Sequence, residues 1–266
     1  MYIWCSYCLS LIDEQPPFEN SAVSHGICTS CLASLMKADP PEIRLAALAA
    51  FRDKLNRAGI DADVSRIPGL LYDARELGVR VSDVLVGVAG ALLYEYGEAW
   101  HQGKISIAQE HRFTAFFETL LHFIKVSHPE IAIRLRDRSP KCLLTPVPGN
   151  RHTLGIRMLE VWLAEHGVTC MTVEPDLPAD EIAALADQLR PTIVGLSISI
   201  PNQVAALTDL ADSLHKLPAP PAVVAGGFAV KSSTEIARVS SAGVTLLPGL
   251  RDLAAFIESA TPGVFQ

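Results

Sequence analysis

Asn150-Arg-His152-Thr-Leu-Gly155 joins a strand-like run, Cys142-Leu-Leu-Thr-Pro-Val147, to a helix predicted over residues 153–166. The helix is indicated by apolar side chains at helical spacing, namely Leu154, Met158, Leu159, Trp162 and Leu163. A loop between a strand and a helix lies at the carboxyl edge of a parallel sheet, where open α/β folds bind ligands. Gly155 permits a close backbone approach at this edge. A lone histidine in such a loop is most simply a surface residue, so the case for His152 depends on other segments.

Two further apolar runs end in small residues. Thr192–Leu196 precedes Ser197-Ile-Ser199, and Ala222–Ala225 precedes Gly226-Gly227. From residue 139 onward, strands and helices alternate, which predicts an α/β fold with a five-stranded, doubly wound parallel sheet over 139–266. The expected strands are 141–146, 168–173, 192–198, 221–225 and 243–247, and the expected helices are 153–166, 179–189, 203–215, 232–239 and 250–259.

These three segments resemble, in order and spacing, the Asp-x-His-x-x-Gly, Ser-x-Leu and Gly-Gly signature of the flavodoxin-like cobalamin-binding domain. The resemblance covers residues 139–266. It implies that His152 replaces the dimethylbenzimidazole base as the lower axial ligand of cobalt. It also implies that four residues line the slot for the displaced nucleotide tail, namely Ser197, Ser199, Gly226 and Gly227.

Two positions depart from this signature, because Asn150 replaces the acid and Ser199 replaces the leucine. A carboxylate would accept a hydrogen bond from one ring nitrogen of the ligand histidine and make the other nitrogen more basic. The Asn150 amide oxygen can accept the same bond but carries no charge, so we expect His152 to be a weaker donor to cobalt. This change does not favour fast methyl transfer, and it is compatible with a sensor or with a site for another tetrapyrrole.

Residues 42–138 read as a four-helix unit that follows a linker at Ala38–Glu42. Ser82 is the expected N-cap of the third helix. The expected helices are 43–58, 67–77, 82–99 and 105–126.

The turn between the last two helices carries Trp100-His101 and, ten residues on, Glu110-His111. Alone, these four residues are equally compatible with a core aromatic and solvated charges. Placed before a cobalamin-type domain, they resemble the helical cap of the light-sensing adenosylcobalamin repressors of carotenoid synthesis. That resemblance implies that Trp100 packs on the upper axial group and that Glu110 bonds the adenosyl ribose. It also implies that His101 takes the cobalt position vacated after photolysis, with His111 at the cap contact.

Residues 1–37 hold two Cys-x-x-Cys pairs separated by 19 residues, where the repressors carry a winged helix-turn-helix. The pairs are Cys5 with Cys8 and Cys28 with Cys31. This spacing predicts a tetrahedral zinc site, with an iron–sulfur cluster or reduced thiols as alternatives. We expect residues 12–24 between the pairs to form a polar loop.

Composition limits the class of protein. A chain of 266 residues with 49% hydrophobic residues is long enough for about two domains. The longest apolar runs are too short for a membrane span, and the N-terminus lacks the features of a secretory signal, so we expect a cytoplasmic protein. A net charge of −7 and a pI near 5.6 argue against direct nucleic-acid binding through a general basic surface.

Together these observations predict a cobalamin-dependent sensor that binds adenosylcobalamin and zinc. We expect it to respond to light and to signal by contact with a protein partner such as a transcription regulator, or through a light-dependent oligomer. No nucleophile or acid–base motif indicates an enzyme. Two alternatives stay open: a corrinoid carrier of a methyltransferase system, and a heme- or bilin-binding sensor on the same fold.

Overall fold

The structure is a computed structural model that describes residues 1–35, 45–129, 131, 141–174, 177–232 and 243–260. The chain divides into two compact units, Met1–Ser127 and His128–Gln266. The predicted linker at residues 38–42 and the predicted helix at 232–239, apart from residue 232, lie outside the described residues.

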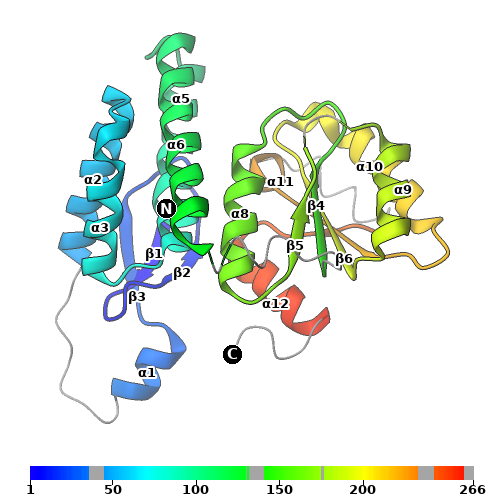
Figure 1. Ribbon diagram of the computed structural model, residues 1–266, viewed down its shortest axis with the longest axis horizontal. Helices are drawn as coiled ribbons and strands as arrows, with labels where there is room; N and C mark the ends of the chain where they lie inside the picture. The colour runs from blue at the N-terminus through cyan, green and yellow to red at the C-terminus, as the bar shows by residue number, and fades with distance from the viewer. Residues whose placement is uncertain (36–44, 130, 132–140, 175–176, 233–242, 261–266) are drawn as a thin grey trace. The chain divides into compact units, whose positions relative to one another are not determined.

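The second unit contains the predicted parallel sheet, in the order β5-β4-β6-β7-β8 (Figure 1). Relative to chain order this is 2-1-3-4-5, the flavodoxin-like arrangement, and it confirms the predicted α/β fold class. All four pairings are parallel. The strands are β4 (Cys142–Pro146), β5 (Cys170–Thr172), β6 (Ile193–Ser197), β7 (Ala222–Gly226) and β8 (Thr245–Leu246).

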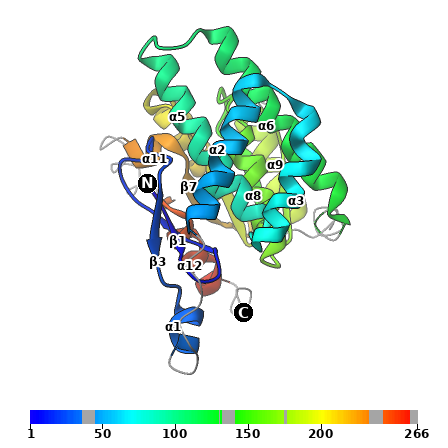
Figure 2. The same cartoon turned by 90° about the vertical axis from the view of Figure 1, so that its left-hand side faces the viewer.

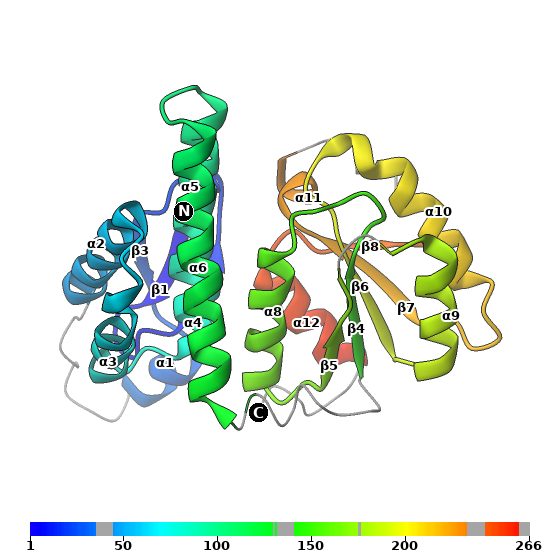
Figure 3. The same ribbon diagram turned by 45° about the horizontal axis from the view of Figure 1, so that its top comes forward.

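Helices cover both faces of this sheet, as expected for a doubly wound fold (Figure 3). One face is covered by α8 (Leu154–Glu165) and α12 (Leu250–Ala260), and the other by α9 (Ala179–Leu189) and α10 (Val204–His215). The short helices η3 (Pro201–Gln203) and α11 (Phe228–Ser232) follow β6 and β7 directly. The predicted bounds of α9 agree with the structure at both ends.

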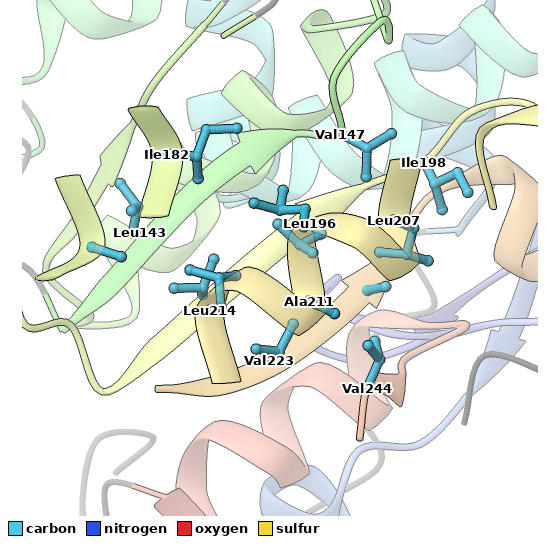
Figure 4. Close-up of a cluster of buried hydrophobic side chains, with 14 of the residues drawn as sticks. Leu143, Val147, Ile182, Leu196, Ile198, Leu207, Ala211, Leu214, Val223 and Val244 are labelled. Carbon is cyan, nitrogen blue, oxygen red and sulfur yellow. The ribbon is translucent and has the colours of Figure 1, made fainter. Parts of the chain in front are cut away.

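The core of the second unit follows the two-residue period of the strands. Leu143, Leu196 and Val223 contribute to one buried cluster with side chains of α9 and α10 (Figure 4). Leu144 and Gly195 lie on the opposite face, where a Cβ on Gly195 would come within 2.8 Å of the Leu144 side chain. Because β4, β6 and β7 are buried on both faces over most of their length, they form largely apolar runs that can be recognised in the sequence.

The first unit contains a helical bundle (Figure 2). Helix α2 packs on α3 and α6, and α5 packs on α6. Phe113 of α6 stacks on Tyr96 of α5 with ring centroids 3.9 Å apart, and Gly59 of α2 lies directly against the Phe113 ring. The helices are α2 (Leu45–Asp61), η1 (Val64–Arg66), α3 (Ile67–Leu77), α4 (Val81–Asp83), η2 (Val84–Ala89), α5 (Gly90–His101) and α6 (Ile107–Ser127).

The predicted helix at 82–99 differs from the structure in two respects. The helix begins at Val81, and its N-cap is Arg80, so the prediction of Ser82 as N-cap is wrong. Ser82 is instead fully buried in the first turn. The helix is also interrupted by η2, a π-helical segment of six residues that separates α4 from α5.

The N-terminal residues form a three-stranded sheet in the order β2-β1-β3, where the sequence predicted a polar loop over residues 12–24. Strand β1 (Tyr2–Cys5) pairs antiparallel with β2 (Leu11–Glu14) and parallel with β3 (Val23–Gly26), and α1 (Thr29–Leu35) follows. These strands were not predicted because each has only four residues and only β1 is mostly buried, so the sequence shows no clear apolar pattern.

No single helix within the described ranges is both long enough and apolar enough to cross a membrane. One pair, Val64–Leu77 with Val81–His101, meets those criteria only when taken together, and it is bent by 118°.

Candidate functional site

The loop after β4 holds Asn150 and His152 in a fixed arrangement. Asn150 is fully buried, and its side-chain amide donates to the Ser197 carbonyl oxygen at 2.9 Å. Its Oδ1 lies 3.1 Å from the backbone nitrogen of His152 and 3.2 Å from the ring Nδ1 of His152. His152 itself is exposed. The buried asparagine therefore connects the end of β6 to the exposed histidine.

These contacts determine which ring nitrogen of His152 carries the proton. A backbone N–H can only donate, so the asparagine atom that faces it is the oxygen. The same oxygen faces Nδ1, which must then carry the hydrogen. Nε2 of the neutral imidazole is left with a free lone pair, which is the form in which histidine binds metal ions. The arrangement gives an exposed, oriented nitrogen ligand at the carboxyl edge of the sheet.

The other predicted residues of the second unit lie at or just after the ends of β6 and β7, except Gly155, which lies in the first turn of α8. Ser197 ends β6 and is in register with Gly226, which ends β7. Gly227 has a φ of +113°, and a Cβ there would lie 2.5 Å from the Ile198 carbonyl oxygen, so only glycine fits. Gly155 has no protein atom within 4 Å of the position of a Cβ. The structure thus gathers the histidine loop and these strand ends at one edge and leaves open space at Gly155.

Gln203 supports this edge and was not identified from the sequence. It is buried, and its Oε1 accepts from the backbone nitrogens of Ser199 at 3.1 Å and Ile200 at 3.3 Å. Its Nε2 lies 3.5 Å from the Gly149 carbonyl oxygen, in the loop that carries His152. Gln203 stands three residues after the helix N-cap, as in a capping box. The N-cap is Ile200 rather than Ser or Thr, so the usual sequence signal is missing.

The predicted residues Trp100, His101, Glu110 and His111 lie in the first unit, at the end of α5 and the start of α6. Trp100 is 46% exposed, and the His111 side chain is 72% exposed. Glu110 is held by the Thr114 hydroxyl, which donates to its Oε1 at 2.8 Å, while its Oε2 lies 3.6 Å from Nε2 of His111. The tip of this helical hairpin therefore presents an indole, two imidazoles and a positioned carboxylate.

The four N-terminal cysteines converge as predicted from their spacing. The sulfur atoms of Cys5, Cys8, Cys28 and Cys31 all lie within 4.8 Å of one another, and those of Cys8 and Cys28 are 3.8 Å apart. A tetrahedral zinc site with bonds of about 2.3 Å requires sulfur atoms about 3.8 Å apart. The cluster is consistent with a small metal-binding element.

The protonation of these thiols is uneven. Burial opposes ionisation of Cys5, but backbone hydrogen bonds at Cys28, Cys8 and Tyr7 outweigh it and lower the pKa of Cys5 to about 6. Burial, followed by hydrogen bonds to the other three cysteines, raises the pKa of Cys31. Backbone hydrogen bonds thus favour the thiolate of Cys5, whereas burial disfavours the thiolate of Cys31.

Comparison with known proteins supports a cobalamin-binding family for this chain. Residues 140–247 match a family model described as a B12 binding domain, and residues 51–125 match a second model with the same description. The first segment contains the His152 loop, and the second contains the hairpin with Trp100 and His101. The family matches in both units therefore support a cobalamin cofactor.

One curated relative is the HTH-type transcriptional repressor CarH of Myxococcus xanthus, which is 28% identical over 167 residues. The alignment covers 58% of this chain and 54% of CarH, so the chain spans about half the length of that relative. Among solved structures, the monomethylamine corrinoid protein of Methanosarcina barkeri superposes with a TM-score of 0.60 at 18% identity. That match covers 78% of this chain and 96% of the corrinoid protein, and it shows a shared fold.

Proposed function

We propose that this chain is a cobalamin-binding regulatory protein that responds to light and signals to a protein partner. The observation that carries the proposal is the buried Asn150, which orients His152 with Nε2 free at the carboxyl edge of the sheet. This edge belongs to the segment that matches a B12 binding domain. An exposed imidazole nitrogen of fixed tautomer is suited to bind a cobalt ion from below a corrin ring.

In this proposal His152 is the lower axial ligand. The strand ends with Ser197, Ser199 and the Gly226-Gly227 pair would line the slot for the nucleotide tail. Gly155 would face the cofactor, because no protein atom occupies the space beside it. When bound as adenosylcobalamin, the cofactor supplies a weak cobalt–carbon bond that absorbs visible light.

The hairpin residues would serve the upper face. Trp100 offers a half-exposed indole for packing, and Glu110 offers a carboxylate already positioned by Thr114. His101 would become a cobalt ligand after illumination, with His111 at the cap contact. The similarity to the repressor CarH favours a regulatory role over catalysis. Because residues 1–35 form a cysteine-bearing sheet and helix, we propose a transcription regulator or other signalling protein as the partner that carries the output.

A second candidate is a corrinoid carrier of a methyltransferase system. The structural match to a corrinoid protein favours it, although the uncharged Asn150 side chain that contacts the His152 ring does not favour rapid methyl transfer. A heme- or bilin-binding sensor is a third candidate, and the fold is the single observation that supports it.

An absorption spectrum of the protein purified in the dark separates these candidates. We expect adenosylcobalamin to copurify or to bind when added, and to change its spectrum on illumination with blue or green light. A methylcobalamin spectrum without a light response would support the carrier, and a heme or bilin spectrum would support the third candidate.

Two variants test the axial ligands. His152→Ala should weaken cobalamin binding strongly and shift the visible bands, and an unchanged affinity and spectrum would refute the lower-ligand assignment. His101→Ala should bind adenosylcobalamin in the dark but fail to form the bis-histidine spectrum after light. If that spectrum forms in both proteins, His101 is excluded and His111 becomes the next candidate.

A further inference from the structure

The N-terminal metal-binding element and the helical bundle meet at a close contact between Trp4 and Gly87. Trp4 is completely buried, although it immediately precedes Cys5 in β1. A Cβ on Gly87 would lie 2.5 Å and 2.9 Å from two atoms of the Trp4 ring, Cζ2 and Cη2. The indole therefore occupies the space that a side chain at position 87 would need.

Gly87 lies in the π-helical segment η2, directly before α5. A π-helical turn in the middle of a helix is rare and frequently marks a functional position. Here the wider turn coincides with the position at which a buried indole enters the helix surface. Since α5 starts at Gly90 and ends with Trp100 and His101, the contact lies at one end of the helix that carries these candidates.

Two polar contacts fasten the same N-terminal segment to the helices. The fully buried carboxylate of Asp83, next to η2, accepts from the Leu11 backbone nitrogen at 3.4 Å and from Arg80. Ser21 bonds to both Arg52 of α2 and Glu95 of α5, which are themselves paired at 2.8 Å. Leu11 and Ser21 both lie between the two cysteine pairs, so the segment is held by helices in its middle and by the thiol cluster at its ends.

We propose that Cys5, Cys8, Cys28 and Cys31 bind one zinc ion, and that this ion locks Trp4 against Gly87 and so fixes the start of α5. Four sulfurs close the tetrahedral coordination shell of zinc, so the ion serves structure rather than catalysis. The sheet has strands of only four residues, so the metal adds to the contacts of Trp4, Leu11 and Ser21 in keeping it ordered. Removal of the metal should release Trp4 from η2.

The metal site is tested by elemental analysis of the full chain after purification under reducing conditions. We expect one zinc per chain in the wild type and much less in Cys28→Ser. Chelation should also shift the tryptophan emission to longer wavelength, because the Trp4 indole becomes exposed. This shift should be absent in Trp4→Phe, which keeps the other two tryptophans. Iron in place of zinc, or a zinc content that Cys28→Ser leaves unchanged, would overturn the assignment.

The coupling is tested with a matched pair of glycine substitutions. Gly87→Ala places a methyl group against the Trp4 ring, whereas Gly97→Ala in α5 meets no atom within 4 Å. If the metal site is coupled to the contact between Trp4 and Gly87, Gly87→Ala should weaken zinc affinity about tenfold, as measured in competition with a chromogenic chelator. Gly97→Ala should leave the zinc affinity unchanged.

A third variant keeps the test decisive if Gly87→Ala folds poorly. Adding Trp4→Phe to Gly87→Ala provides space for the new methyl group and should recover most of the lost zinc affinity. Equal zinc affinity in Gly87→Ala and Gly97→Ala would show that the metal site and η2 are independent. A double variant with a zinc affinity no higher than that of Gly87→Ala would show the same. Because these measurements use zinc alone, their outcome does not depend on whether the chain binds cobalamin.

Discussion

Replacing Asn150 by aspartate tests whether the hydrogen bonds around His152 are arranged as the structure shows. The introduced carboxylate can still accept from the His152 backbone and from Nδ1. It cannot donate to the Ser197 carbonyl oxygen, which Asn150 contacts at 2.9 Å. At neutral pH, Asn150→Asp therefore places a second acceptor against that carbonyl in a fully buried position.

The expected cost follows from this geometry. The Ser197 carbonyl oxygen keeps its hydrogen bond from the Val147 backbone nitrogen at 3.0 Å, so the variant loses one of two bonds to this oxygen. It also places a buried negative charge beside the oxygen, and together these changes cost about 1–3 kcal/mol of folding free energy. The cost should depend on pH, because the protonated carboxyl can donate to Ser197 and burial also favours the neutral form. The pKa of the introduced carboxyl should then be raised in the folded state. The variant should approach wild-type stability below about pH 4 and lose stability as pH rises through the raised pKa.

Urea denaturation followed by circular dichroism, at pH 4 and pH 7, measures this difference. Asn202→Asp is the matched control, since Asn202 is exposed in the same unit and should show no such loss. If Asn150→Asp is as stable as wild type at pH 7, the amide contact with the Ser197 carbonyl is refuted. In the folded variant, the negative charge should make His152 a stronger cobalt ligand.

Three further predictions concern residues of the second unit. Gly155→Ala should leave the unfolding free energy nearly unchanged but should lower the cobalamin affinity measured in titrations. The reason is that the new Cβ would enter open space that the cofactor is proposed to occupy, and an unchanged affinity would contradict this. Gly227→Ala should cost more than about 2 kcal/mol in thermal or urea unfolding, because it combines a positive φ with a steric clash. Gly149→Ala, with a positive φ but open space, should cost only about 1 kcal/mol, and equal costs would refute the clash. Burial raises the pKa of the Cys142 thiol to about 12, against a smaller opposing effect of a backbone hydrogen bond. Iodoacetamide at pH 8 should therefore leave Cys142 unmodified in the native protein and modify it only after unfolding. Mass spectrometry measures this difference.

The sequence predicted the second unit closely, because its central strands β4, β6 and β7 are mostly buried on both faces and its helices are amphipathic. Apolar runs such as Ile193–Ser197 predict a buried parallel strand from local sequence alone. The residues that follow each run could be placed at the carboxyl edge for the same reason, which is how His152 and Ser197 were identified. The spacing of the cysteines likewise predicted their convergence, since two Cys-x-x-Cys pairs form a local pattern.

Tertiary structure alone decided the contacts between residues far apart in the chain. The fit of Trp4 against Gly87 joins positions that no periodicity relates, and the π-helical turn at that contact has no sequence signal of its own. The amide of Asn150 could be oriented only once the Ser197 carbonyl and the His152 backbone were placed around it. Local patterns determine which elements form, because periodicity reports which face of a segment is buried. The partner of each buried polar or aromatic group is a property of the packed fold.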